Sequence, residues 1–304
     1  MDSLFFALII LDLVIITGVM GVQDKRFDEN YAVTWGNEHV KFVNEGRDIQ
    51  LSMDPSSGAG FASKLSYRTG FFHMRIKLPA GGCAGVVTAF YNVSVYMQLH
   101  SHTNKHDELD FEFLGNQKGK PITLQTNVFS NGQGNREQRV ILWFDPTADF
   151  HNYQILWNEH QIVFYVDDVP IRVFKNNTSI GVNYPSQAMK IEASLWNGED
   201  WATDGGRTKI DWSLSPFRVQ FQDFNIDGCS VSTGYQRRNK SITTKSTDRI
   251  CYSSEYWWNA EKYRNLTPKQ QEEYENVRAQ YMNYDYCSDR NRYPVQPPEC
   301  ESNI

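Results

Sequence analysis

The chain has 304 residues and a formal net charge of −6, from 30 lysines and arginines against 36 aspartates and glutamates. An acidic balance of this size does not favour a polyanionic partner, so nucleic acid is not expected as a ligand. The length fits either two average domains or one large β-sandwich with an extension.

The first 21 residues are apolar for most of their length and end in small residues near Gly18 and Gly21. This pattern is typical of a secretory signal peptide, with cleavage after about Gly21. Asp12 interrupts the apolar run and no lysine or arginine precedes it, which weakens both this interpretation and the alternative of a membrane anchor. We expect a secreted chain with no membrane association after cleavage.

Short runs rich in β-branched and aromatic residues recur between turn signals, and nothing resembles alternating strand and helix units. The pattern favours the sandwich with an extension. Trp143 and Trp157 lie inside two of these runs and are expected in the core. The predicted strands are Phe72–Leu78, Val86–Tyr91, Val140–Phe144, Tyr153–Trp157, Gln161–Val166, Met189–Trp196 and Val219–Ile226.

Three acids alternate with apolar residues in the run His-Asp-Glu-Leu-Asp-Phe-Glu-Phe-Leu-Gly-Asn over residues 106–116. Glu108, Asp110 and Glu112 share one face of a predicted strand, and the apolar residues between them need a core on the other face. Crowded carboxyl groups cannot all ionise at neutral pH, so an acid and a carboxylate nucleophile are expected side by side. Glycoside hydrolysis uses such a pair.

The spacing of the acids requires a curved strand. On a straight strand the Cα atoms of Glu108 and Glu112 would lie about 13 Å apart, whereas a retaining mechanism needs carboxyl groups about 5 Å apart. A bent sandwich would make the side chains converge, with Asp110 bridging them. The alternatives are a solvated acidic face, or a cation site with His106 and Asp107. We expect no metal and no cofactor.

A helix is predicted beyond the sandwich. Thr267 as N-cap, Pro268 at the first helical position and Gln270 form a capping-box pattern. The apolar positions Tyr274, Val277 and Tyr281 then follow helical spacing. No internal repeat and no low-complexity segment accompanies it.

Four of the five cysteines, Cys229, Cys251, Cys287 and Cys300, fall after the strand-rich region. In a secreted chain they indicate two disulfides that staple a loop-rich extension. Sequential pairing, Cys229 with Cys251 and Cys287 with Cys300, closes the shorter loops, although three connectivities are possible and spacing alone does not choose. Cys83 is expected to be a buried, inert thiol. Glycosylation sequons begin at Asn92, Asn176, Asn177, Asn239 and Asn265.

Four segments together resemble the plant xyloglucan endotransglucosylase/hydrolases of glycoside hydrolase family 16: His106–Asn116, Leu142–His151, Ser194–Thr203 and Tyr293–Cys300. The resemblance covers essentially the whole mature chain. It implies an all-β fold, a bent β-jelly-roll with an open glycan cleft, and a C-terminal extension that lengthens the cleft on the acceptor side. The expected organisation is a signal peptide at 1–21, a catalytic domain at 22–220 and the extension at 221–304.

The resemblance also implies roles for individual residues. Glu108 matches the nucleophile, Glu112 the general acid/base, and Asp110 the residue that orients the nucleophile and tunes its ionisation. The other matching positions carry amide, charged and aromatic groups suited to sugars, of which Trp196 could instead be a core residue. They are Tyr91, Gln125, Thr126, Asn127, Asn135, Arg136, Glu137, Arg139, Trp196, Trp201, Ala202, Gly206 and Arg292.

Two departures from the family accompany the match. The connection at 92–105 is about twice the expected length, and its His100 and His102 are interpreted as solvated rather than metal-binding. The residues after Phe-Leu-Gly, Asn116-Gln-Lys, lack the usual sequon, so no glycan is expected there. The resemblance also favours transfer over hydrolysis. The stretch 128–137 lacks the loop insertion of the predominantly hydrolytic members of the family, and the acidic run has Asp-Phe-Glu rather than their Asp-Ile-Glu.

The leading interpretation is a secreted, monomeric enzyme of the plant cell wall or apoplast. It would cut the β-1,4-glucan backbone of a xyloglucan donor with retention and rejoin it to a xyloglucan acceptor. The alternatives are a net xyloglucan hydrolase, or a jelly-roll protein that binds glycan but has lost turnover because of the long connection.

Overall fold

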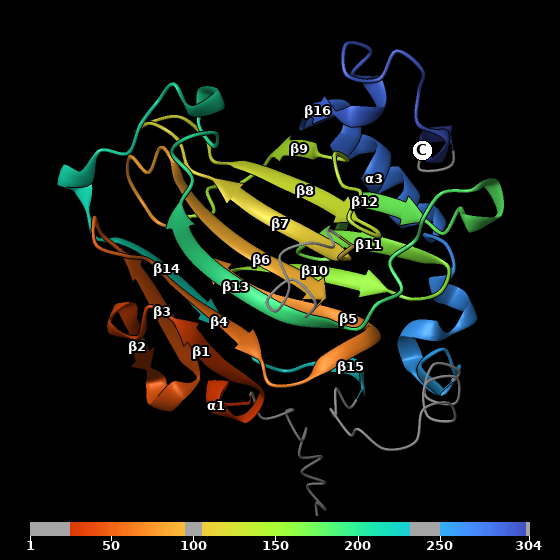
Figure 1. Ribbon diagram of the computed structural model, residues 1–304, viewed down its shortest axis with the longest axis horizontal. Coiled ribbons are helices and arrows are strands. Elements are labelled where there is room, and N and C mark those ends of the chain that lie inside the picture. The colour runs from red at the N-terminus through yellow and green to blue at the C-terminus, as the bar shows by residue number, and fades with distance from the viewer. Residues whose placement is uncertain (1–24, 95–104, 232–249, 302–304) are drawn as a thin grey trace, which may run out of the picture.

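The computed structural model describes residues 25–94, 105–231 and 250–301, which form two antiparallel β-layers packed face to face (Figure 1). The expected signal peptide, most of the long connection with His100 and His102, and the sequon at Asn239 lie outside the described residues. No helix within the described ranges is long and apolar enough to span a bilayer.

One layer, named layer A here, contains the acidic strand. Its members follow each other as antiparallel neighbours from the N-terminal edge to the C-terminal extension. In spatial order they are β1 (Tyr31–Trp35), β4 (Ala59–Ser63), β13 (Met189–Asn197), β6 (Val86–Ser94), β7 (Glu108–Leu114), β8 (Thr123–Phe129), β9 (Gln138–Ile141) and β16 (Met282–Asp285).

The second layer, layer B, lies behind the first and includes the long strand β5, which also meets layer A where Tyr67 pairs with Met189. This contact joins the two layers at one corner. In spatial order the strands are β2 (Val40–Val43), β3 (Asp48–Met53), β14 (Phe217–Gln222), β5 (Ser66–Lys77), β10 (His151–Trp157), β11 (Gln161–Val166) and β12 (Val169–Lys175), with β15 (Asp227–Val231) also paired to β5.

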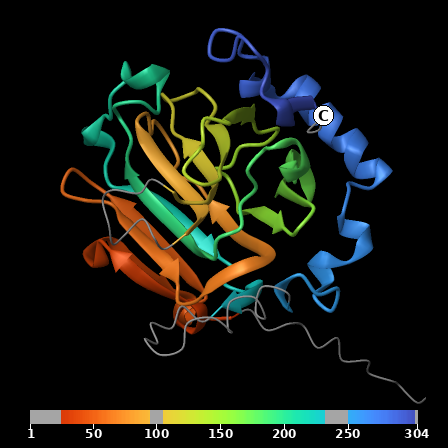
Figure 2. The ribbon, with the colours of Figure 1, turned by 45° about the vertical axis from the view of Figure 1, so that its right-hand side comes forward.

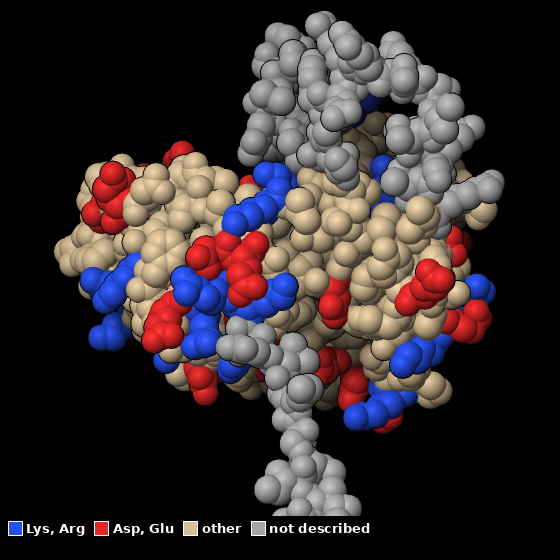
Figure 3. Space-filling view, turned by 90° about the horizontal axis from the view of Figure 1, so that it is seen from below, with Lys and Arg blue, Asp and Glu red and all other residues tan. Residues whose placement is uncertain are grey.

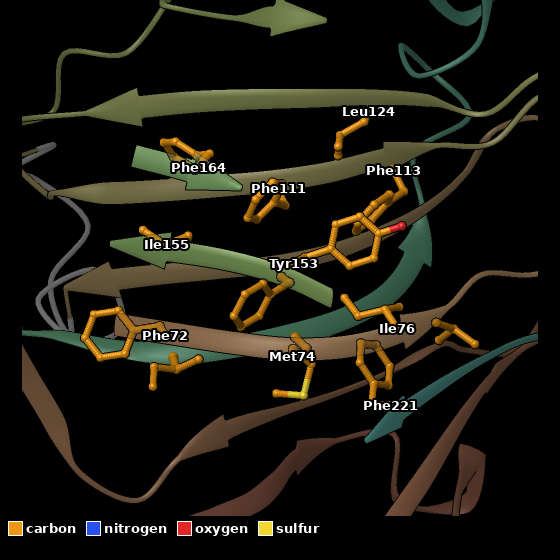
Figure 4. Close-up of a cluster of buried hydrophobic side chains, with 14 of the residues drawn as sticks. Phe72, Met74, Ile76, Phe111, Phe113, Leu124, Tyr153, Ile155, Phe164 and Phe221 are labelled. Atoms are coloured by element: carbon orange, nitrogen blue, oxygen red, sulfur yellow. The ribbon is translucent and has the colours of Figure 1, made fainter. Parts of the chain in front are cut away.

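The core between the layers is built on the apolar residues of the acidic strand. Leu109, Phe111 and Phe113 are all buried, as their alternation with the acids predicted. The Phe113 ring meets that of Tyr153 edge-on at 4.6 Å, and Phe111 meets Phe164 at 5.1 Å (Figure 4). The aromatic packing therefore fixes which face of β7 points outward, and that face carries the acids.

Every predicted strand is present, but some of the ends were wrong. β9 stops at Ile141, so the predicted run to Phe144 leaves the sheet early. β14 begins at Phe217 and ends at Gln222, where Asp223 adopts a left-handed backbone with φ +65°. Trp157 is fully buried as expected, whereas Trp143 is only partly buried and packs on the core from outside.

The C-terminal extension runs along one side of the sandwich (Figure 2). Its helix α3 (Pro268–Gln280) has the predicted capping box and packs on β12 through buried Tyr274 and Val277. A second, single-turn helix, α1 (Phe27–Asn30), precedes β1.

Both disulfides follow the sequential pairing, with S–S distances of 2.03 Å for Cys229–Cys251 and 1.98 Å for Cys287–Cys300. Cys83 is a buried free cysteine, as predicted. Lysine and arginine side chains mix with acidic ones on the face seen in Figure 3, so neither positive nor negative charge dominates the described part of that face.

Asn92 is a poor glycosylation site in this fold. Its side chain is fully buried on the core face of β6, next to Leu109 and Ile191 on the neighbouring strands. Neither its amide nitrogen nor its oxygen has a hydrogen-bond partner among the described residues. The sequon at Asn92 is therefore inaccessible in the folded chain, whereas Asn265 is exposed and Asn176 and Asn177 are partly buried.

Replacing Asn92 with leucine is expected to stabilise the protein by about 1–2 kcal/mol, because an unsatisfied buried amide is replaced by an apolar group of similar size. The melting temperature would rise by about 2–4 °C for each kcal/mol. Asn92→Asp is the matched control, since it also removes the sequon but leaves a polar group and is expected to destabilise. A lower melting temperature for the leucine variant would show that the amide is satisfied in solution.

Candidate active site

The three acids project from the outer face of β7, flanked by β6 on one side and β8 on the other. Asp110 is buried, with 5% of its surface exposed, whereas Glu108 and Glu112 are half-buried. The register places Tyr91 of β6 and Asn127 of β8 directly beside Asp110. The acids therefore lie at the centre of layer A and not on its edge.

The carboxyl groups act on one another. Burial, followed by the negative charges of Glu108 and Glu112, holds the pKa of Asp110 well above its ordinary value, and Asp110 also shares a hydrogen bond with Glu108. Burial likewise raises the pKa of Glu112, reinforced by the charges of Glu108 and Glu137 and opposed by a hydrogen bond from Gln125. The crowding expected from the sequence is thus present, and protonated and ionised carboxyl groups can coexist here.

A chain of hydrogen bonds fixes Glu112 from the β8 side. Gln125 Nε2 donates to Glu112 Oε2 at 2.7 Å, and Arg139 Nε donates to Gln125 Oε1 at 2.7 Å. The arginine also lies over the ring of Tyr284, 5.3 Å from its centroid. Because both ends of the Gln125 amide are engaged, its orientation toward Glu112 is determined.

His106 contacts the acid at the other end of the strand. Its Nε2 atom lies 3.2 Å from Glu108 Oε2, and its ring packs on Phe129 at 5.0 Å. In the sequence-based predictions, His106 belongs only to the alternative of a cation site. Its two-residue spacing from Glu108 was the signal that could have identified it as a neighbour on the same face.

Asp107 has a structural role that argues against the cation alternative. Its buried carboxylate accepts backbone N–H bonds from Asn131, Ser186 and Gln187 at 2.7–2.8 Å. These contacts hold two loops against the start of β7. The side chain is therefore occupied on the opposite face of the strand from Glu108.

The C-terminal extension reaches the loop between β8 and β9. Arg292 donates to Glu137 Oε2 at 2.7 Å and to Asn135 Oδ1 at 2.6 Å. The Tyr293 hydroxyl donates to the backbone oxygen of Asn135 at 2.8 Å. Three of the predicted contact residues are thus brought together from segments far apart in the sequence.

Trp196, in the same cross-strand row as Leu114 of β7, forms an aromatic pair with Trp201; the ring centroids are 6.0 Å apart and both rings are partly exposed. Trp201 and Ala202 line a hollow of about 390 Å³ together with Arg139 and Tyr284. Gly206 closes the turn beneath them at φ +84°, where a Cβ atom would lie 2.0 Å from the Asp200 oxygen. Leu114 of β7, two residues from Glu112, also lines this hollow.

Two predicted contacts are corrected by the structure. Thr126 faces the core and not the cleft, because side chains alternate between the two faces of β8 and its neighbour Gln125 faces the cleft. The backbone and hydroxyl oxygens of Thr126 accept hydrogen bonds from the buried Arg172. Arg136 is buried in an ion pair with Glu299 at 2.8 Å, which ties the loop after β8 to the extension. Neither side chain is placed to contact a glycan on layer A.

Glu192 is a cleft-face residue that was missed. It lies directly beside Tyr91 in the register, and the Tyr91 hydroxyl donates to Glu192 Oε2 at 3.1 Å. Burial raises the pKa of Tyr91, and the charges of Glu192 and Glu108 add to the effect. The alternation of Glu192 with core residues of the predicted strand Met189–Trp196 could have revealed it.

Comparison with known families gives two matches along the chain. The family described as "Glycosyl hydrolases family 16" matches residues 27–214. The family described as "Xyloglucan endo-transglycosylase (XET) C-terminus" matches residues 252–300. The first covers the sandwich through β13, and the second covers the helix and the last disulfide.

Relatives match over most of their length. The chain is 57% identical over 277 residues to xyloglucan endotransglucosylase/hydrolase protein 2 of Arabidopsis thaliana, covering 91% of this chain and 89% of that protein. It is 48% identical over 279 residues to xyloglucan endotransglucosylase protein 2 of Diospyros kaki, covering 91% and 88%.

Among solved structures, a Bacillus licheniformis β-glucanase matches with a TM-score of 0.51 at 24% identity, over 64% of this chain and 89% of that chain. A Thermotoga petrophila laminarinase catalytic domain matches with a TM-score of 0.53 at 18% identity, over 70% and 98%. These two likenesses establish the jelly-roll fold alone. The family matches and the relatives show that the chain belongs to the xyloglucan endotransglucosylase/hydrolases of glycoside hydrolase family 16.

Proposed function

We propose that this protein cuts the β-1,4-glucan backbone of xyloglucan with retention and joins the cut end to a second xyloglucan chain. The observation that carries the proposal is the set of three interacting carboxyl groups on the outer face of β7, of which Asp110 and Glu112 have raised pKa values. A mechanism with one protonated and one ionised carboxyl group needs this arrangement.

In the proposed first step, Glu108 attacks the anomeric carbon of a backbone glucosyl unit. The bond to the departing oxygen breaks, and Glu112 gives that oxygen its proton, so that a covalent glycosyl-enzyme forms. In the second step Glu112 takes a proton from an incoming hydroxyl group, which attacks the anomeric carbon and releases Glu108. A sugar hydroxyl gives transfer, and water gives hydrolysis.

Asp110 is proposed to hold Glu108 in place. Its raised pKa keeps it protonated at a pH where an ordinary aspartate is ionised, so it can donate a hydrogen bond to the Glu108 carboxylate. A pair that shares one proton also reaches its singly ionised form at lower pH than an isolated carboxyl group does.

Asp110→Asn is therefore expected to slow transfer by about 10–100-fold, because the amide still donates to Glu108 but more weakly. The acid limb of the kcat/KM profile should move to higher pH, since the shared proton is lost. The measurement is kcat/KM from pH 4 to pH 8 for the variant and the parent protein. An unchanged acid limb would contradict proton sharing between Asp110 and Glu108.

The contact residues that face the cleft are proposed to bind glycan on both sides of the acids. Tyr91 flanks Glu108 and Asp110, and Trp196 and Trp201 offer aromatic faces to pyranose rings. Gln125, Asn127 and Arg139 offer groups that bind sugar hydroxyls, as do Asn135, Glu137 and Arg292 at the extension. We further propose that the protein works as a secreted monomer in the plant cell wall.

The test is to incubate the purified protein with xyloglucan and a fluorescently labelled xyloglucan oligosaccharide. Incorporation of label into polymer and release of reducing ends are followed in the same tube. Label incorporation without new reducing ends is expected and would establish transfer. Reducing ends without incorporation would establish a hydrolase instead, and binding without either signal would leave a glycan-binding protein.

A further inference from the structure

Trp35, at the end of β1, is a large aromatic side chain that remains 40% exposed. A row of directly opposed residues runs from it across layer A to the acids: Trp35 pairs with Gly60, Gly60 with Ser194, Ser194 with Ala89, and Ala89 with Glu112. Opposed residues in antiparallel strands share a face of the sheet. Trp35 therefore stands in line with Glu112 on one face.

The position of the indole ring is fixed by a glycine beneath it. A Cβ atom at Gly60 would point outward from layer A and would lie 2.4 Å from Trp35 Nε1. The ring thus covers Gly60 on the outer face of the sheet, the face that carries Glu112. The Thr34 hydroxyl, which donates to the Gly60 backbone oxygen at 3.1 Å, holds the end of β1 against β4.

The row has the length of a short glucan segment. Four strand spacings separate β1 from β7, which corresponds to roughly 19 Å at about 4.8 Å per spacing. This is the length of about four β-1,4-linked glucosyl units. Ser194 and Ala89, the side chains between Trp35 and Glu112, are small, so a glycan can pass over them.

We propose that Trp35 is a sugar-stacking residue that binds the backbone of the donor glycan about four glucosyl units from the cleavage point. The extension contacts the cleft at the opposite edge of layer A, beyond β9, through Arg292 and β16. Since the resemblance implies that the extension lengthens the cleft on the acceptor side, Trp35 is assigned to the donor side. The inference rests on the proposed function for the identity of the glycan, but the stacking itself needs only a β-1,4-glucan in the cleft.

The inference is tested by binding in a Glu108→Ala background, where the glycan is not consumed. Calorimetry gives Kd for xyloglucan oligosaccharides with backbones of two and eight glucosyl units. Trp35→Ala is expected to weaken binding of the longer oligosaccharide about tenfold, the effect of losing one aromatic stacking contact. The shorter oligosaccharide can be bound without reaching Trp35, so its affinity should change much less.

Matched variants separate stacking from general damage. Trp257 has nearly the same exposure, 39%, and packs on Phe71 of layer B, so Trp257→Ala should leave both affinities unchanged. Trp35→Phe should restore most of the affinity, and Gly60→Ala, which displaces the ring, should weaken binding in the same direction as Trp35→Ala. Circular dichroism and melting temperatures verify that each variant is folded.

The stacking role of Trp35 and the proposed transfer activity can fail independently, and the experiments distinguish the two failures. Equal affinities of the Trp35→Ala variant and its parent for the longer oligosaccharide would overturn the inference, as would an equal loss for both lengths. In the active protein, Trp35→Ala should raise KM for polymeric donor about tenfold and leave KM for the labelled acceptor unchanged. A protein that binds through Trp35 but transfers nothing would refute the proposed function and leave the inference standing.

Discussion

Replacing Glu108 with alanine is expected to reduce xyloglucan transfer by about 10⁴-fold or more while leaving glycan affinity nearly unchanged. The carboxylate is proposed to form the covalent bond to the anomeric carbon, and no other described group is placed to do so. His106, 3.2 Å away, and Asp110 contact this carboxylate but lie to its sides on the same strand face. Without the Glu108 carboxylate the covalent glycosyl-enzyme cannot form, so the expected loss is larger than that of a stabilising contact.

The measurement combines label incorporation with calorimetric affinity for a xyloglucan oligosaccharide. Glu272→Ala is a suitable control, because Glu272 is an exposed acid on α3 in the C-terminal extension. Mass spectrometry of the acid-quenched parent protein should detect a glycosyl adduct on the peptide that contains Glu108. Retained transfer in the Glu108→Ala variant would refute the covalent mechanism, and lost affinity would assign Glu108 to binding.

Sequence alone predicted the part of the site that lies on one strand. The alternation of Glu108, Asp110 and Glu112 with apolar residues determined both the strand and its outward face, because the side-chain period of a strand is two. The position of Trp157 inside an apolar run likewise predicted its burial. Features within one strand or a helix cap depend on local spacing and can be predicted from the sequence.

The residues around the acids could not be predicted in this way, because register decides which strands bring them together. Tyr91 and Glu192 meet across β6 and β13, and Arg136 pairs with Glu299, 163 positions later. Thr126 was assigned to the cleft from a family match, yet it is offset by one residue from Gln125 and so faces the core. A shift of one residue reverses the face of a side chain.

Several strands of the sandwich were not predicted, and two of them, β12 and β8, carry polar residues in buried positions. β12 contains Arg172, which is fully buried and donates to Thr126 at 2.8 Å from behind β8. β8 contains Gln125 and Asn127, whose amides are buried beside Glu112 and Asp110. Alternation of apolar and polar residues is the usual sequence signal for a strand, and buried polar residues at or near a functional site interrupt it.

Replacing Glu112 with alanine is expected to reduce transfer from polymeric xyloglucan by about 10³-fold, the usual contribution of a general acid. Burial is the largest reason that the pKa of Glu112 is raised, so the proton stays in place to a higher pH than on an ordinary glutamate. Activity of the parent protein should therefore fall as pH rises through this pKa. The variant has no such proton to lose, and the basic limb of its kcat profile should disappear.

The leaving group distinguishes this role from that of Glu108. An aryl glycoside of a xyloglucan oligosaccharide leaves without protonation, so Glu112→Ala should still form the glycosyl-enzyme from it, whereas Glu108→Ala should not. The burst of released phenol measures this first step. Gln125→Ala is the matched comparison, because it removes the 2.7 Å hydrogen bond to Glu112 but keeps the carboxyl group. That bond opposes the rise in the pKa of Glu112, so the basic limb should persist in Gln125→Ala and move to higher pH. An aryl donor impaired as strongly as the polymer in Glu112→Ala would show that Glu112 does more than transfer protons.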